Sequence, residues 1–181
     1  VVGSALSFGP TAISVTQKIQ NVQSAIEDED YQLQAEMLYN LAAENPWWRS
    51  LWEKSGDAAI EAGDFTLARK VYEKALEIGS LSDAGMIQLG EVYYQGADNQ
   101  AAEDIWLEFE GSGRALILLA ELYEERGDIT AAVNTWEKYF SLPEEPTNPQ
   151  RVFHYGLLLA AESPKDAIPL LDQSQDEYPV A

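Results

Sequence analysis

The chain has 181 residues, of which 46% are hydrophobic, so it is long enough to bury a substantial core. Acidic residues outnumber basic ones by 31 to 11, and the net charge of −20 makes nucleic acids and anionic lipid surfaces poor partners. The chain has no cysteine, which excludes disulfides, thiolate nucleophiles and thiolate metal sites and leaves the compartment open. The acidity fits solubility or a salt-adapted source as well as it fits selection for a basic partner.

Residues 1–10 form an apolar extension without a charged side chain. We expect this extension to be either the trimmed end of a membrane span or signal sequence, or a terminus that docks partly on the first helix. It is too short to cross a bilayer, which needs about 20 apolar residues. The localisation is unknown; it leans toward the extracytoplasmic part of a membrane-anchored or secreted protein, with the cytoplasm as the alternative. A membrane is expected as a partner only through a segment outside this chain.

Residues 11–46 are long enough for a first pair of helices, although their repeat pattern is degenerate. Asp30 marks the turn of this pair, Leu38 lies on its second helix, and Pro46 ends it. The acidic run Glu27–Asp30 lacks the alternating ligands and the central glycine of a calcium loop, so we interpret it as a solvated turn before a helix N-cap.

Residues 47–80 show the clearest pattern of helix, turn and helix. Trp52 and Gly56 fall on one face of the first helix. Gly63 then ends this helix, because glycine adopts the left-handed conformation at low cost, and Asp64 caps the next helix. The same combination recurs at Gly127-Asp128 and, in a weaker form, at Ala97-Asp98.

A small residue on the first helix of each pair is followed about twelve positions later by an alanine on the second. This spacing occurs in Gly56/Ala68, Gly90/Ala102 and Ala120/Ala132 and, one residue shorter, in Gly156/Ala167. We expect the small residues to lie where two antiparallel helices cross closely, since a large side chain there would cost about 1–3 kcal/mol. A period in the low thirties is typical of stacked helical repeats.

These patterns resemble the tetratricopeptide repeat (TPR) family, whose signature is W-x2-L-G-x2-Y followed by A-x3-F and P. Three stretches carry the resemblance: Trp52-x2-Ser55-Gly56 with Ala68-x3-Tyr72, Met86-x2-Leu89-Gly90-x2-Tyr93 with Ala102-x3-Trp106, and Leu116-x2-Leu119-Ala120-x2-Tyr123 with Ala132-x3-Trp136. The resemblance implies an all-α fold, a right-handed α-α superhelix (solenoid) of about five TPR-like helix pairs.

The predicted organisation is an extension followed by five units. The units are residues 11–46 (degenerate), 47–80, 81–112, 113–146 and 147–181 (an imperfect C-terminal copy). The linkers differ in length, so we expect an irregular superhelix.

Catalytic chemistry is poorly represented. The single histidine, His154, has no cysteine and no nearby sequence partner, so we interpret it as a packing or surface residue. Gly111–Arg114 is rich in glycine, but no strand precedes it and no Lys-Ser/Thr follows it, so it is a tight connection and not a phosphate loop. We therefore expect no enzyme, no cofactor and no metal site.

In tetratricopeptide arrays the first helix of each unit lines the concave groove, and the resemblance therefore implies a set of groove residues. These are Glu53, Asp57, Glu61, Ile87, Glu91, Tyr94, Ile117, Glu121 and Glu124. The best-known chaperone-binding members hold an acidic C-terminal carboxylate with Lys and Asn, whereas Glu and Asp stand here. This departure favours a basic partner, or one with Lys or Arg beside apolar anchors. The alternative is that the acidic face is only solvated.

Trp47 and Trp48 cannot both face one core, because adjacent residues on a helix point about 100° apart. We expect one indole to pack on the preceding unit and the other to be exposed, as a contact for a partner or a second copy.

The predicted function is a non-enzymatic protein-interaction scaffold that binds a peptide or protein segment along its acidic groove. The alternative is a structural spacer or oligomerisation domain of a larger, membrane-anchored protein.

Overall fold

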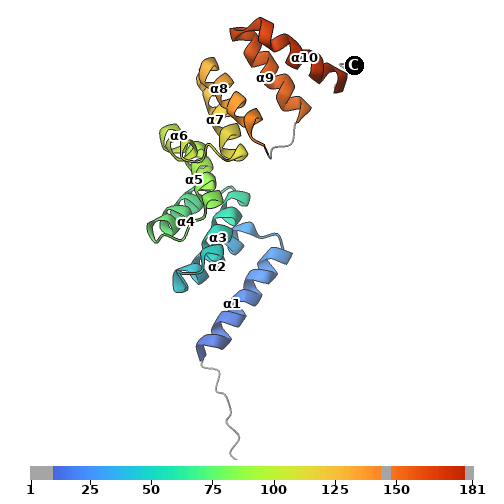
Figure 1. Cartoon of the computed structure of the whole chain (residues 1–181). Coiled ribbons are helices and arrows are strands. Elements are labelled where there is room, and N and C mark those ends of the chain that lie inside the picture. Colours follow the sequence, from blue (N-terminus) through green and yellow to red (C-terminus); the bar gives the residue numbers. More distant parts are fainter. Residues whose placement is uncertain (1–9, 144–147, 178–181) are drawn as a thin grey trace, which may run out of the picture. The chain divides into compact units, whose positions relative to one another are not determined.

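The computed structural model describes residues 10–143 and 148–177, and every regular element in these ranges is a helix (Figure 1). The helices are α1 (Pro10–Glu27), α2 (Tyr31–Glu44), α3 (Arg49–Glu61), α4 (Phe65–Glu77), α5 (Asp83–Gln95), α6 (Asn99–Leu107), α7 (Gly113–Arg126), α8 (Ile129–Ser141), α9 (Pro149–Glu162) and α10 (Pro164–Glu177). The expectations for residues 1–9 and for the middle of the linker before α9 lie outside the described residues. No helix of the described ranges combines the length and the hydropathy that crossing a membrane requires.

The predicted all-α fold of about five helix pairs is confirmed. The chain divides into two compact units, residues 1–98 with α1 to α5 and residues 99–181 with α6 to α10. Consecutive helices pack within each unit, as in α2 with α3, α3 with α4, α7 with α8 and α9 with α10. The division into the five repeat units stays a prediction.

A common turn joins the two helices of a pair. Its last residue before the cap has a positive φ, and the following aspartate donates its backbone N–H to the carbonyl oxygen five residues earlier. The four copies are Glu29-Asp30, Gly63-Asp64, Ala97-Asp98 and Gly127-Asp128, with φ of 54°, 73°, 60° and 73° at the first residue. The Asp30, Asp64 and Asp128 carboxylates then accept from the amide three residues later, at 2.9–3.1 Å. The predicted caps at Asp64 and Asp128 are therefore confirmed, and the copies at Glu29 and Ala97 adopt the turn without glycine.

The small residues hold the helices of a pair close together. A Cβ atom added at Gly56 would lie 2.4 Å from Cε2 of Tyr72, whose side chain is fully buried. Gly156 approaches Leu171 in the same way, at 2.9 Å. The side chain that fills the space beside each of these two glycines lies four residues beyond the repeat alanine. The repeat alanines, Ala68 among them, are buried as well.

Consecutive pairs are joined by hydrogen bonds between a tyrosine and a carboxylate. In the first unit the Tyr93 hydroxyl on α5 donates to Glu73 on α4 at 3.1 Å. In the second unit the Tyr123 hydroxyl on α7 donates to Glu103 on α6 at 3.0 Å. Each tyrosine lies 20 positions after its glutamate, so the same contact is repeated. Burial and the carboxylate both raise the pKa of these phenols, that of Tyr123 to about 12, so the hydroxyls remain donors at neutral pH.

Candidate functional site

An acidic pocket of about 210 Å³ lies between α3 and α5 in the first unit. Its lining residues are Glu53 and Asp57 from α3, Tyr72 from α4, and Ser82, Ala84, Gly85 and Gln88 from the start of α5. A Cβ atom added at Gly85 would lie 2.6 Å from Cδ1 of Leu81 and 3.1 Å from Oε1 of Glu53, so the start of α5 approaches the Glu53 carboxylate closely. Glu53 and Asp57, two of the expected groove residues, are therefore brought together.

The two carboxylates of this acidic pocket are held in place by hydrogen bonds. The Tyr72 hydroxyl donates to Oδ1 of Asp57 at 2.5 Å, and the Ser82 amide donates to Oε1 of Glu53 at 2.9 Å. Burial is the main cause of the raised pKa of Tyr72, and the hydrogen bond to Asp57 raises it further, so the phenol keeps its proton and remains a donor. Tyr72 was expected only as a packing residue, because its contact with Asp57 spans two helices.

The other expected groove residues of the first unit differ in exposure. Glu61 is exposed, while Glu91 and Tyr94 are half-buried, and Glu91 accepts a hydrogen bond from Gln88 Nε2 at 3.3 Å. Ile87, also expected in the groove, is only 5% exposed, so its side chain belongs to the core. The repeat pattern marks only the residues of α5 at the helix crossing, whereas burial of apolar surface also favours an inward position for Ile87. The buried face of α5 is therefore wider than the pattern indicates.

The expected groove residues of the second unit lie on α7, beside α9. Ile117 is half-buried against the core, Glu124 is half-buried, and Glu121 is exposed. Glu124 accepts from Trp136 Nε1 at 2.9 Å, and its second oxygen lies 2.7 Å from Nε2 of His154. Trp136 is therefore a core residue that also fixes a carboxylate of this face.

Helix α9 places Arg151 and His154 beside the acidic residues of the second unit. Arg151 donates to the Tyr139 hydroxyl at 2.9 Å, and His154 contacts Glu124. Although the Glu121 side chain is exposed overall, partial desolvation of its carboxyl group and repulsion from Glu124 raise its pKa, and Arg151 and His154 oppose that shift. Arg151 was not among the residues expected from the sequence. Its position three residues before His154, one helical turn away on α9, was the available signal.

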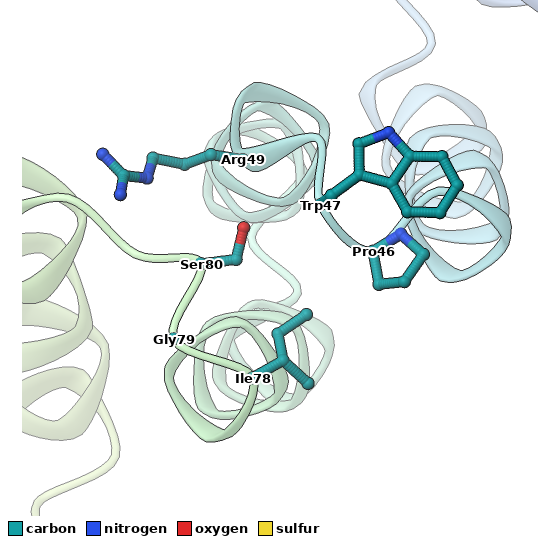
Figure 2. A pocket seen from close by; sticks show the side chains of 6 residues that line it. All are labelled: Pro46, Trp47, Arg49, Ile78, Gly79 and Ser80. Atoms are coloured by element: carbon teal, nitrogen blue, oxygen red, sulfur yellow. The ribbon is translucent and has the colours of Figure 1, made fainter.

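Trp47 and Trp48 are both substantially exposed, at 78% and 44% of their surface. Trp47 lines an open cavity of about 650 Å³ with Pro46, Arg49, Ile78, Gly79 and Ser80, at the turns that precede α3 and follow α4 (Figure 2). In Figure 2 the Arg49 side chain extends away from the indole of Trp47. Trp48 faces the other way and lines a cavity with residues of α1 and α2.

That second cavity has a volume of about 270 Å³ and lies among α1, α2 and α3. Its lining is mostly apolar: Ile19, Val22, Gln23, Ile26, Gln34, Leu38, Leu41, Trp48, Ser50, Leu51 and Lys54. This cavity could not be predicted from the repeat pattern, because the first helix pair is degenerate and its cavity-lining residues do not stand at recognisable repeat positions.

Comparisons with known proteins agree with the helical-repeat fold. A family model described as the tetratricopeptide repeat matches residues 50–78, which cover nearly all of α3 and α4. No curated protein matches the chain. Among solved structures, the MamA protein has a TM-score of 0.73 at 17% identity, covering 92% of this chain and 96% of its own.

Two further solved structures are similar. YrrB, a TPR protein with an unusual peptide-binding site, has a TM-score of 0.66 at 15% identity, covering 90% of this chain and 85% of its own. A tetratricopeptide repeat protein from Parabacteroides merdae ATCC 43184 has a TM-score of 0.73 at 16% identity, covering 92% of this chain and 67% of its own. At these identities the likeness concerns the fold.

Proposed function

Because this chain is a TPR-like helical repeat domain, we propose that it is a non-enzymatic interaction module that binds a peptide or protein segment carrying basic side chains. Such repeats serve as protein-binding scaffolds, and the similar YrrB is a TPR protein with a peptide-binding site. The single observation that carries the proposal is the acidic pocket between α3 and α5, where Glu53 and Asp57 share one small opening.

The acidic pocket is suited to the end of a Lys or Arg side chain. Hydrogen bonds from Tyr72 and the Ser82 amide hold the two carboxylates before a partner arrives, so binding costs little side-chain entropy. A cation about 4 Å from one carboxylate gains roughly 1–4 kcal/mol, depending on how far water is excluded. Two carboxylates also discriminate against acidic partners.

The second unit presents a face of mixed charge. Glu121 is the exposed acid there, while Glu124 is already engaged by Trp136 and His154. Arg151 opposes part of the charge of these glutamates, so this face is less suited to a basic side chain than the acidic pocket is. The basic specificity of the module therefore rests on the first unit.

The test uses a neutral variant that preserves the hydrogen bond. Asp57→Asn keeps an acceptor for Tyr72 and removes one charge, and Asp104→Asn on the exposed surface of α6 is the matched control. Basic peptides selected from a random displayed library would be titrated by calorimetry against both variants. We expect Asp57→Asn to weaken binding about three- to tenfold and Asp104→Asn to leave it unchanged. Equal affinities for both variants, with unchanged circular dichroism, would contradict the proposal.

A second candidate function, oligomerisation, is favoured by one observation. Trp47 exposes 78% of its surface beside Pro46 and the half-exposed Ile78, and apolar side chains gathered in this way are typical of protein contacts. Such a contact would join copies of the chain through the turns of the first unit and would leave the acidic pocket open. The dependence of the sedimentation coefficient on protein concentration distinguishes it from peptide binding.

A further inference from the structure

Helix α3 separates two openings of opposite chemistry in the first unit. Glu53 and Asp57 line the acidic pocket toward α5, and Lys54 lines the apolar cavity toward α1 and α2. Both openings are reached along the same helix, because these three residues lie within about one turn of it. A segment that lies across α3 therefore meets both.

The apolar cavity differs in charge from the rest of the chain. Its eleven lining residues include no Asp or Glu, although acidic residues outnumber basic ones by 31 to 11. Lys54 is its one charged lining residue and is exposed, and within the described part of the chain no carboxylate pairs with it. An ammonium at the edge of an apolar surface is complementary to a carboxylate beside an apolar side chain.

The cavity has room for large side chains. Its volume of about 270 Å³ exceeds the roughly 150 Å³ that admits benzene, and lies just below the range of about 300–1,000 Å³ of sites for whole small molecules. Ile19, Ile26 and Trp48 remain 36%, 51% and 44% exposed at this cavity, so their surfaces are available to an incoming group. The size fits one or two side chains of a peptide.

We propose that the apolar cavity is a second binding site for the same partner that the acidic pocket binds, and we call it the anchor subsite. It takes a large apolar side chain of the partner, and Lys54 binds an Asp or Glu adjacent to that side chain. The inference rests on the proposed function, since it assumes a peptide partner on α3. It adds that the partner carries an acidic-apolar anchor in addition to the basic residue that enters the acidic pocket.

Continuity with the acidic pocket favours a peptide over other occupants. A peptide is the one occupant that fills the cavity and also supplies a cation to Asp57 on the other side of the helix. A long acyl chain has a carboxylate for Lys54 but no group for the acidic pocket. A second copy of this chain would bring a net charge of −20 toward a protein with the same charge and offers few basic side chains for the acidic pocket, so it fits the two openings together less well than a peptide does.

The experiment is a selection from a random displayed peptide library on the wild type and on Lys54→Glu. We expect the wild type to enrich peptides with Asp or Glu beside Leu, Ile, Met or Phe, and Lys54→Glu to enrich Lys or Arg at that acidic position. In titrations, Lys54→Glu should bind a peptide enriched on the wild type about three- to tenfold more weakly than the wild type does. Changing the acidic residue of that peptide to Lys should restore its affinity for the Lys54→Glu variant. Lys165→Glu, at an exposed lysine of α10, is the matched charge control and should change nothing.

The apolar part is tested by Ile26→Asn. Because Ile26 is 51% exposed, the variant should fold, as far-ultraviolet circular dichroism will check, and should bind the enriched peptides about tenfold more weakly. The inference is overturned if no peptides are enriched, if the enriched peptides show no acid beside the anchor, or if Lys54→Glu behaves like Lys165→Glu. Two other outcomes also overturn it if peptide selection fails. The first is that the wild type binds oleate and Ile26→Asn does not, which would make the cavity an acyl-chain site. The second is that Ile26→Asn removes a concentration-dependent dimer, which would make the cavity a contact between two copies. Asp57→Asn separates the two proposals: if it has no effect while Lys54→Glu does, the basic-partner function fails and the anchor subsite stands.

Discussion

Gly56→Ala is expected to destabilise the first unit, although alanine favours helices. The new Cβ would lie 2.4 Å from Cε2 and 2.5 Å from Cζ of Tyr72. The Tyr72 ring is completely buried and tied to Asp57 by its hydroxyl, so it cannot rotate into solvent. The helices are therefore pushed apart, and the ring is displaced so that its hydrogen bond to Asp57 is lost.

The magnitude follows from three contributions. Overpacking costs about 1–3 kcal/mol. Loss of a hydrogen bond to a charged acceptor costs about 1.5–3 kcal/mol. The gain in helix propensity from Gly to Ala is about 1 kcal/mol. We therefore expect the free energy of unfolding to fall by about 2–4 kcal/mol.

Urea denaturation followed by circular dichroism measures this loss. Gly111→Ala is the matched control, because a Cβ atom at Gly111 meets nothing within 4 Å, and it should stay within about 0.5 kcal/mol of the wild type. Tyr72→Leu removes the ring, so Gly56→Ala should cost clearly less in that background. A Gly56→Ala protein as stable as the wild type, or more stable, would refute the packing argument.

Two further predictions concern Glu121 and Trp47. Partial desolvation raises the pKa of Glu121 in the folded state above its value in the unfolded state, so stability is lost as the pH rises through the folded-state pKa. Glu121→Gln removes this charge and should therefore raise the free energy of unfolding at pH 7 by about a few tenths of a kcal/mol. The difference from the wild type should vanish under acidic conditions, where Glu121 is protonated in both states. Chemical denaturation across pH measures this, and a less stable Glu121→Gln at pH 7 would contradict it. If the chain self-associates through its exposed indole, Trp47→Ala should remove the concentration dependence of the sedimentation coefficient and leave the unfolding free energy within about 0.5 kcal/mol. Persistence of that dependence in Trp47→Ala would exclude this surface.

Features set by neighbouring residues could be predicted from the sequence. The turn at Gly63-Asp64 follows from the conformational freedom of glycine and the reach of an aspartate to an amide three residues on, and both are local. Burial of Ala68 followed from its repeat spacing. These two kinds of signal were sufficient for the helices and their pairing.

Features that depend on contacts between distant residues could not be predicted. Glu124 belongs to the expected face, but its hydrogen bond with Trp136 and its contact with His154 join residues 12 and 30 positions apart. The apolar cavity beside Lys54 is formed by three helices, and the degenerate first pair gave no repeat position from which to infer it. The burial of Ile87 likewise depends on how α5 is rotated against its neighbours.

The tyrosine–glutamate contacts between consecutive pairs have a consequence for changing the number of repeats. Glu73 and Tyr93 in the first unit correspond to Glu103 and Tyr123 in the second, each 30 positions later. If residues 83–112 were removed, Tyr123 would follow Glu73 by the same number of residues as Tyr93 does now. Ser82 would then precede α7 at the N-cap position that Ser112 has in the intact chain. The chain thus has a built-in site at which one whole repeat can be deleted, or duplicated, without creating a new kind of junction.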